Sequence, residues 1–258
     1  MILVVLLLGC GGEGEVRTPP PNSEDPAVDT DIEDTDSEID TDSDSDSDVV
    51  QTGPCPANMA EIEDFCIDRY EAWLDGQSPF EVPTDGVAVT GPGEIPQGYI
   101  SGDVAAAACD AAEKRLCTLN EWMRACQGPG GTTYPYGDVY DANACNDTRS
   151  QHPIIELFGA GADWSPGQMN DPQLNQLPDS LAAGGANPDC VTAEGVFDMH
   201  GNLHEWIDEP NGTFKGGFYM DAVINGPGCT YATTAHTTPY HDYSTGFRCC
   251  SDPASQAR

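Results

Sequence analysis

The stretch Gly195–Trp206, which reads G-V-F-D-M-H-G-N-L-H-E-W, decides how this sequence is interpreted. Its two carboxylates, Asp198 and Glu205, lie seven residues apart, and Gly201 and Asn202 between them allow a sharp turn that exposes carbonyl groups. Hard cations such as Ca²⁺ take about six to eight oxygens from carboxylates, amides and backbone carbonyls. The stretch can therefore supply several ligands of a cation site, or it can equally form a polar surface turn that ends in a core tryptophan.

Four further blocks accompany this stretch in a fixed order. They are Lys114–Trp122 (K-R-L-C-T-L-N-E-W), Tyr134–Gly137 (Y-P-Y-G), Lys215–Tyr219 (K-G-G-F-Y) and Gly246–Cys249 (G-F-R-C). Together the blocks resemble the formylglycine-generating enzyme family, also called sulfatase-modifying factors. That family's motifs read G-x-x-(D/N)-M-x-G-N-x-x-E-W, K-R-L-P-T-x-x-E-W, Y-P-W-G, R-G-G-S-x and G-F-R-C. The resemblance covers Cys55 to about Asp252, and ordered blocks are far more specific than any single motif.

The resemblance implies an α+β, loop-rich fold similar to a C-type lectin and stabilised by disulfides and calcium. It implies one calcium site on the stretch quoted above, with the glycine and the leucine ligating through their carbonyl oxygens. A second site of the family begins at an asparagine, which the segment Cys145–Asp147 matches best. The predicted calcium ligands are Asp198, Gly201, Leu203, Glu205, Asn146 and Asp147.

The sequence departs from the family where the family's chemistry takes place. The resemblance implies oxidation of a substrate cysteine by copper, held by two cysteines that follow the G-G-S-x block, and soft thiolates suit Cu(I). Here the first of these positions matches Asp221, and the second falls near Asn225 or Gly226. Cys229 matches a later structural cysteine of the family. Because a carboxylate cannot reproduce thiolate ligation of Cu(I), we predict that formylglycine-generating activity is absent.

Three residues remain as candidates for another chemistry in the matching cleft: Asp221, His236 and His241. Relatives in the ergothioneine pathway use non-haem iron held mostly by histidines of an additional helical domain, for which this chain has no room. His200 and His204 have the spacing to meet on a helix, but they lie on the predicted calcium-binding bend. We therefore expect neither copper nor iron.

The N-terminal fifth of the chain has a different composition. Residues 1–8 are apolar and lead to Gly9 and Cys10, and Leu-Leu-Gly-Cys resembles a bacterial lipobox, although no Lys or Arg precedes it. We predict a signal peptide over residues 1–10 with lipidation of Cys10; a buried N-terminal strand is the alternative. Residues 11–53 hold 15 of the 44 acidic residues and one base, which predicts a disordered acidic tether. The folded domain is expected over residues 54–258.

The net charge limits which molecules this protein can bind, and the cysteine content bears on whether its compartment is oxidising. A net charge of −35 excludes a protein that binds nucleic-acid phosphates. With Cys10 lipidated, ten of the eleven cysteines remain, and we predict that all ten are paired. The family pattern implies two pairs, and proximity and elimination suggest the others, although spacing alone does not fix connectivity. The pairs are Cys109–Cys249, Cys126–Cys229, Cys55–Cys66, Cys145–Cys190 and Cys117–Cys250.

Local patterns predict few regular elements. A strand or hairpin is expected over residues 55–66, followed by a helix from about Val104 to Lys114 capped by Ser101. A capping box, Thr118 to Glu121, predicts a second helix over residues 119–126. Residues 128–189 read as mostly loop, and residues 214–220 and 245–249 read as short strands.

These observations predict a lipoprotein of the bacterial cell envelope, on its periplasmic or surface side, anchored to the membrane through Cys10. Its folded domain would be calcium-stabilised and non-catalytic, and would bind an unknown extracytoplasmic ligand or protein. One alternative is a metal-dependent oxidoreductase, of the formylglycine-generating or the non-haem iron type, with a divergent site in the same cleft. Another is a purely structural component of the envelope.

Overall fold

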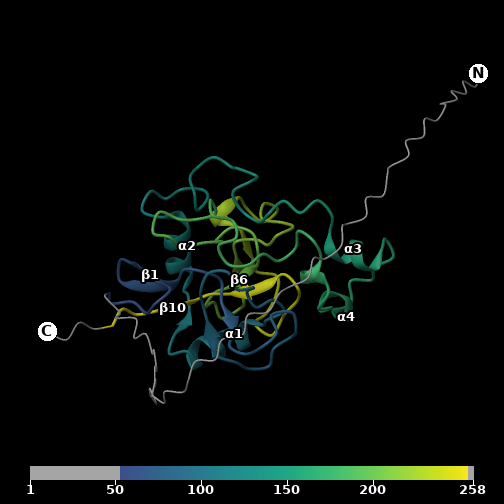
Figure 1. Cartoon of the computed structure of the whole chain (residues 1–258), viewed down its shortest axis with the longest axis horizontal. Helices are drawn as coiled ribbons and strands as arrows, with labels where there is room; N and C mark the ends of the chain where they lie inside the picture. The colour runs from purple at the N-terminus through teal and green to yellow at the C-terminus, as the bar shows by residue number, and fades with distance from the viewer. Residues whose placement is uncertain (1–52, 255–258) are drawn as a thin grey trace, which may run out of the picture. The chain divides into compact units, whose positions relative to one another are not determined.

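The computed structural model describes residues 53–254, which mix short strands and helices with long loops (Figure 1). The predicted signal peptide, Cys10 and the predicted tether up to residue 52 lie outside the described residues. No helix in the described range is long and apolar enough to cross a membrane. The helices are α1 (Gly102–Ala111), α2 (Leu119–Gln127), α3 (Pro153–Phe158) and α4 (Pro166–Met169), with short 3-10 turns η1 (Leu174–Gln176) and η2 (Gly228–Thr230).

The first sheet joins the two ends of the domain. Its strand order is β1-β2-β10-β5, and all neighbours are antiparallel. The hairpin β1–β2 forms where the alternation of apolar and polar residues predicted it, and β10 lies against β2 with Cys250 opposite Ile67. The strands are β1 (Met59–Ile62), β2 (Phe65–Asp68), β5 (Arg115–Leu116) and β10 (Cys249–Ser251).

The second sheet carries the stretch that opened the sequence analysis. Its order is β8-β7-β6-β9, with β6 at the centre of the domain in Figure 1. The parallel pairing of β6 with β9 places Glu205 opposite Gly246, so two of the motif blocks lie side by side. The strands are β6 (His204–Trp206), β7 (Phe214–Lys215), β8 (Ala232–Thr233) and β9 (Thr245–Phe247), and a separate pair is β3 (Trp73–Leu74) with β4 (Ala88–Val89).

Both predicted helix starts are confirmed by their caps. The Ser101 side chain accepts a hydrogen bond from the Val104 amide, and Thr118 forms a complete capping box with Glu121. The strand predicted over residues 214–220 is shorter, because Gly216 and Gly217 take positive φ angles of 86° and 79° and the backbone leaves the extended conformation.

Five disulfides join the ten cysteines of the described residues in the five predicted pairs. Three of these bridges close loops of more than 100 residues and tie α1, α2 and the residue after β5 to the C-terminal half. A domain with this density of disulfides belongs to an oxidising, extracytoplasmic compartment. The core divides between the two sheets: Trp122 packs beside the first and Trp206 beside the second, both almost fully buried.

Candidate functional site

The turn of the Gly195–Trp206 stretch is held in a conformation that few residue types adopt. Asp198 and Asn202 have φ angles of 60° and 55°, and Gly201 has a φ of 81°. A β-carbon on Gly201 would lie 2.3 Å from the carbonyl oxygen of Asn146, so only glycine allows this approach. The Asn202 amide donates to the same carbonyl at 2.8 Å. The two predicted calcium segments therefore pack directly against each other.

Glu205 lies in a buried ion pair with Arg248. Arg248 donates from Nε to Oε2 and from Nη2 to Oε1 of Glu205, both at 2.6 Å, and the indole nitrogen of Trp122 donates to Oε2 at 2.7 Å. Burial opposes the charge on Arg248, but the attraction of Glu205, with smaller contributions from Glu71 and Asp198, raises the pKa of the guanidinium. Both oxygens of Glu205 are thus bonded to protein donors.

A third acid, Glu71, completes what we call the buried ionic cluster (Glu71, Asp198, Glu205 and Arg248). Glu71 accepts hydrogen bonds from the Leu203 amide at 3.0 Å and from the side chain of Asn202. Burial, together with the nearby charges of Asp198 and Glu205, raises the pKa of Glu71 well above its ordinary value. Burial also raises the pKa of Asp198 to about 6, although its Oδ2 accepts a bond of 2.7 Å from the Gly185 amide.

The predicted calcium ligands Asp198 and Glu205 do not fit a calcium ion in this arrangement. A bound calcium needs free carboxylate oxygens, whereas Glu205 is fully engaged and an adjacent guanidinium repels a cation. Within residues 53–254, no group of three or more His, Cys, Asp or Glu side chains has a geometry that could hold a metal ion. The local positive charge is supplied by Arg248.

The second predicted calcium segment has different surroundings. Oδ2 of Asp147 lies 3.0 Å from Nε2 of His200, and the Tyr140 hydroxyl lies near the same carboxylate. Oδ1 of Asp147 is buried, with no partner at full hydrogen-bond geometry in the described residues. A buried carboxylate oxygen without a partner is costly, and it fits a cation or an ordered water better than an empty site. The Asn146 side chain is used within the protein, since its amide donates to the Ser180 carbonyl at 2.8 Å and to Oδ1 of Asn202 at 2.9 Å.

The candidate cleft residues are separated, each with its own partners. Asp221 accepts hydrogen bonds at 3.0 Å from the Val223 and Ile224 amides and at 3.1 Å from the Tyr231 hydroxyl, so its carboxylate organises its own loop. The ring of His236 stacks on Tyr240 with centroids 3.6 Å apart.

His241 makes a different contact, with its Nδ1 atom 2.8 Å from Oδ1 of Asn170. Asp221, His236 and His241 therefore do not form one constellation.

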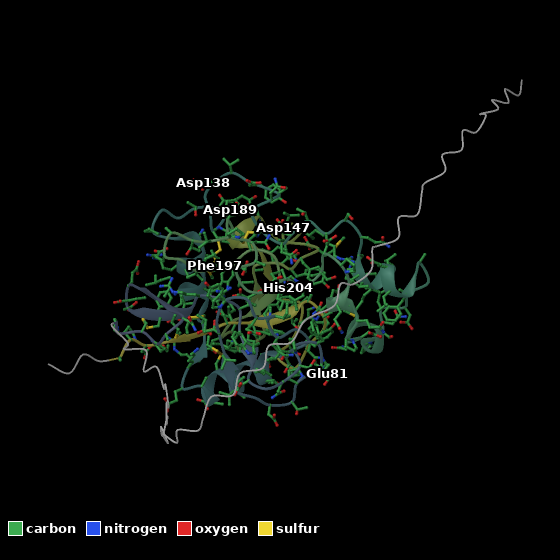
Figure 2. All side chains as sticks on the ribbon, viewed as in Figure 1. Glu81, Asp138, Asp147, Asp189, Phe197 and His204 are labelled. Atoms are coloured by element: carbon green, nitrogen blue, oxygen red, sulfur yellow. A yellow bond between two sulfur atoms is a disulfide. The ribbon has the colours of Figure 1, made fainter. Side chains whose placement is uncertain are left out.

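The two histidines of the stretch occupy different environments, because His204 lies on strand β6 and not on a helix. His204 packs among the rings of Phe214, Phe218 and Tyr231, with centroid distances between 4.6 and 5.4 Å. Burial, with a smaller effect of His236, lowers the pKa of His204 to about 3, so the ring is neutral. Figure 2 shows Asp147 and His204 at separate positions in the domain.

Sequence reasoning missed Glu71 and Arg248. Arg248 belongs to the block G-F-R-C, which was the available signal that a basic residue could pair with Glu205. Glu71 follows the buried strand β2 in a segment without a recognisable motif. No spacing rule relates it to Asn202, which is 131 residues away in the sequence.

Comparisons with known proteins agree with the five sequence blocks. The family description "Sulfatase-modifying factor enzyme 1-like domain" (FGE-sulfatase) matches residues 33–253. No curated protein matches the chain.

Among solved structures, CarF is 18% identical, covers 74% of this chain and 87% of its own, and has a TM-score of 0.48. PvdO from Pseudomonas aeruginosa is 14% identical, with coverage of 73% and 80% and a TM-score of 0.45. The I1 variant of the Major Tropism Determinant is 13% identical, with coverage of 80% and 55% and a TM-score of 0.50. At these identities the likeness concerns the fold alone. The family match spans most of the chain, and this protein therefore belongs to the FGE-sulfatase family of sulfatase-modifying factor enzyme 1-like domains.

Proposed function

We propose that this protein is a membrane-anchored, extracytoplasmic member of its family that binds a ligand or partner and does not generate formylglycine. The observation that carries the proposal is the state of the sulfur atoms. All ten cysteines of the described residues are in disulfides, and the residue that matches the first catalytic cysteine is Asp221.

The chemistry supports this reading. Cu(I) is held best by soft thiolates, and a disulfide sulfur carries no thiolate charge. Asp221 offers a hard carboxylate whose oxygens already bond two backbone amides and the Tyr231 hydroxyl. The other candidate cleft residues, His236 and His241, have partners of their own and form no metal-holding group with Asp221 in the described residues.

The placement of the protein follows from several features. Five disulfides require an oxidising compartment. Lipidation of Cys10 would anchor the chain, with the acidic segment that follows as a tether, and the net charge of −35 excludes nucleic acids.

Calcium belongs to the proposal only at the segment Asn146–Asp147, where Asp147 has an unpartnered buried oxygen. Added Ca²⁺ should raise the melting temperature of the purified protein, and Asp147→Asn should remove that increase. Asp189→Asn, at an exposed aspartate, is the matched control and should keep it. An unchanged increase in Asp147→Asn would show that calcium binds elsewhere.

The direct test is an activity assay with a Cys-x-Pro-x-Arg peptide, after incubation of the protein with Cu(I) and oxygen. We expect no aldehyde product by mass spectrometry, with an active formylglycine-generating enzyme as the positive control. A metal inventory of the purified protein accompanies it. Turnover of the peptide, or stoichiometric copper or iron, would contradict the proposal and favour the alternative of a metal-dependent oxidoreductase.

A further inference from the structure

A polar groove lies on the domain between two loop segments, residues 142–151 and 177–187. It consists of a hollow of about 610 Å³ and a smaller one of about 240 Å³, which share Arg149, Ser150 and Asp179 in their walls. We call these two hollows together the polar groove. A volume of this order suits a small ligand.

Hydrogen bonds and a disulfide within the protein hold the walls of the polar groove in place without a ligand. Asn146 bridges the two segments through its bond of 2.8 Å to the Ser180 carbonyl, and the disulfide Cys145–Cys190 anchors one end of the first segment. The Ala182 amide also donates to Oδ1 of Asn202 at 3.0 Å, which joins the second segment to the turn of the family signature. A preorganised wall loses little conformational entropy on binding.

Several polar side chains that line the groove are not bonded to other protein groups, while Asn143, Asn146, Arg149 and Glu156 are. Within residues 53–254, the side chains of Thr148, Ser150, Asp179 and Asn187 make no hydrogen bond and no ion pair. Arg149 is 9% exposed and lines both hollows, and its Nε atom is buried with no partner, although its other nitrogens bond Glu156 and the Gln151 carbonyl. Hydroxyl, amide and carboxylate groups are thus available together on one surface, while the Arg149 guanidinium is held inside the wall by its own partners.

The charge of the groove restricts its ligand. The guanidinium of Arg149 is neutralised by Glu156, so Asp179 remains as the unpaired charge of the lining. Exposed acids occur both in the upper part of the domain in Figure 2, at Asp138 and Asp189, and in the lower part, at Glu81, and the whole chain carries a charge of −35. Anionic ligands are therefore repelled.

We propose that the polar groove binds a neutral oligosaccharide. Sugar hydroxyls donate and accept hydrogen bonds at once, which matches a lining of amides, hydroxyls and one carboxylate. Leu177 and Leu181 supply apolar contacts for the carbon faces of the rings. Two hollows in series fit a chain of rings better than a single ring. This inference rests on the proposed function and names the class of its ligand.

The experiment measures binding of cellotetraose, maltotetraose and the β-1,4-linked tetramer of N-acetylglucosamine to the full chain by calorimetry and NMR. We expect at least one tetrasaccharide to bind, with an affinity that is insensitive to salt. Asp179→Asn and the double variant Thr148→Val with Ser150→Ala should each weaken it by about three- to tenfold, the effect of losing one or two hydrogen bonds.

The matched controls are Asp110→Asn and Thr234→Val, at exposed positions whose side chains have no partner in the described residues, and both should bind like the unmodified protein. Absence of binding by all three tetrasaccharides overturns the inference. Sugar binding that both groove variants leave unchanged also overturns it. So does a result in which tetralysine, titrated as a cationic probe, binds in a salt-sensitive way and no sugar binds. If the protein neither binds sugars nor oxidises the peptide, the sugar inference fails and the proposed function stands. If it binds sugars and also oxidises the peptide, the sugar inference stands and the proposal that the protein is non-catalytic fails.

Discussion

The buried ionic cluster and the polar groove use the same kinds of side chain in opposite ways. In the cluster, Glu205 and Arg248 saturate each other inside the protein, with both pairs of atoms at 2.6 Å. In the groove, the side chains of Thr148, Ser150 and Asp179 have no partner in the described residues. Satisfied polar groups in the interior fix a fold, whereas exposed polar groups without protein partners are open to water or to a ligand. The family signature therefore marks a region whose polar groups hold the fold together.

The largest expected effect comes from breaking the buried pair. Arg248→Met should lower the free energy of unfolding by about 3–5 kcal/mol, because it leaves Glu205 buried without its counter-charge. Urea denaturation measures this loss. Glu63→Gln, which removes a partly exposed pair with Arg124, should cost only about 0–1 kcal/mol. Equal losses in the two variants would mean that the buried ionic cluster has no special role.

Removal of disulfides should separate stability from binding. The Cys126–Cys229 bridge spans 103 residues and the Cys145–Cys190 bridge spans 45. Replacement of either pair by alanine should cost about 2–5 kcal/mol, with the longer loop costing about 0.7 kcal/mol more in the chain-entropy model. Only loss of Cys145–Cys190 should weaken sugar binding, because that bridge anchors a wall of the polar groove. Equal sugar affinity in both variants would contradict the anchoring role.

The smallest effect is a pH dependence that comes from the cluster. The pKa of Asp198 is raised to about 6 in the folded protein, against about 3.9 for an unfolded chain. The folded state therefore binds the proton of Asp198 more tightly than the unfolded chain does. The stabilisation from this proton is fully present below about pH 4 and is lost as the pH rises through 6. In Asp198→Asn, the decrease in the free energy of unfolding between pH 4 and 7 should be smaller by about 1–3 kcal/mol. Denaturation curves of both proteins between pH 4 and 7 measure the difference, and parallel curves would contradict the assignment.

Much of the fold could be predicted because the relevant signals are local or specific to the family. The capping box of Thr118 and Glu121 depends on residues three positions apart, and the disulfide partners followed from the family pattern and elimination. The environment of Glu205 was missed, because Arg248 reaches it through the parallel pairing of β6 and β9, which no local spacing rule gives. The spacing of His200 and His204 suggested a helix, but tertiary pairing made that segment a turn and a strand.

The polar groove was also beyond sequence reasoning. Residues 128–189 read as loop, and loop composition alone does not say which side chains remain unpaired. That depends on contacts such as the one between Asn146 and Ser180, which are 34 residues apart.

The most direct test of the central contrast is a crystal structure of the protein grown with excess calcium, with anomalous scattering used to locate the ion. We predict that Arg248 contacts both oxygens of Glu205 and that no calcium lies between Asp198 and Glu205. A calcium ion ligated by Glu205, with Arg248 displaced from the carboxylate, would contradict the account.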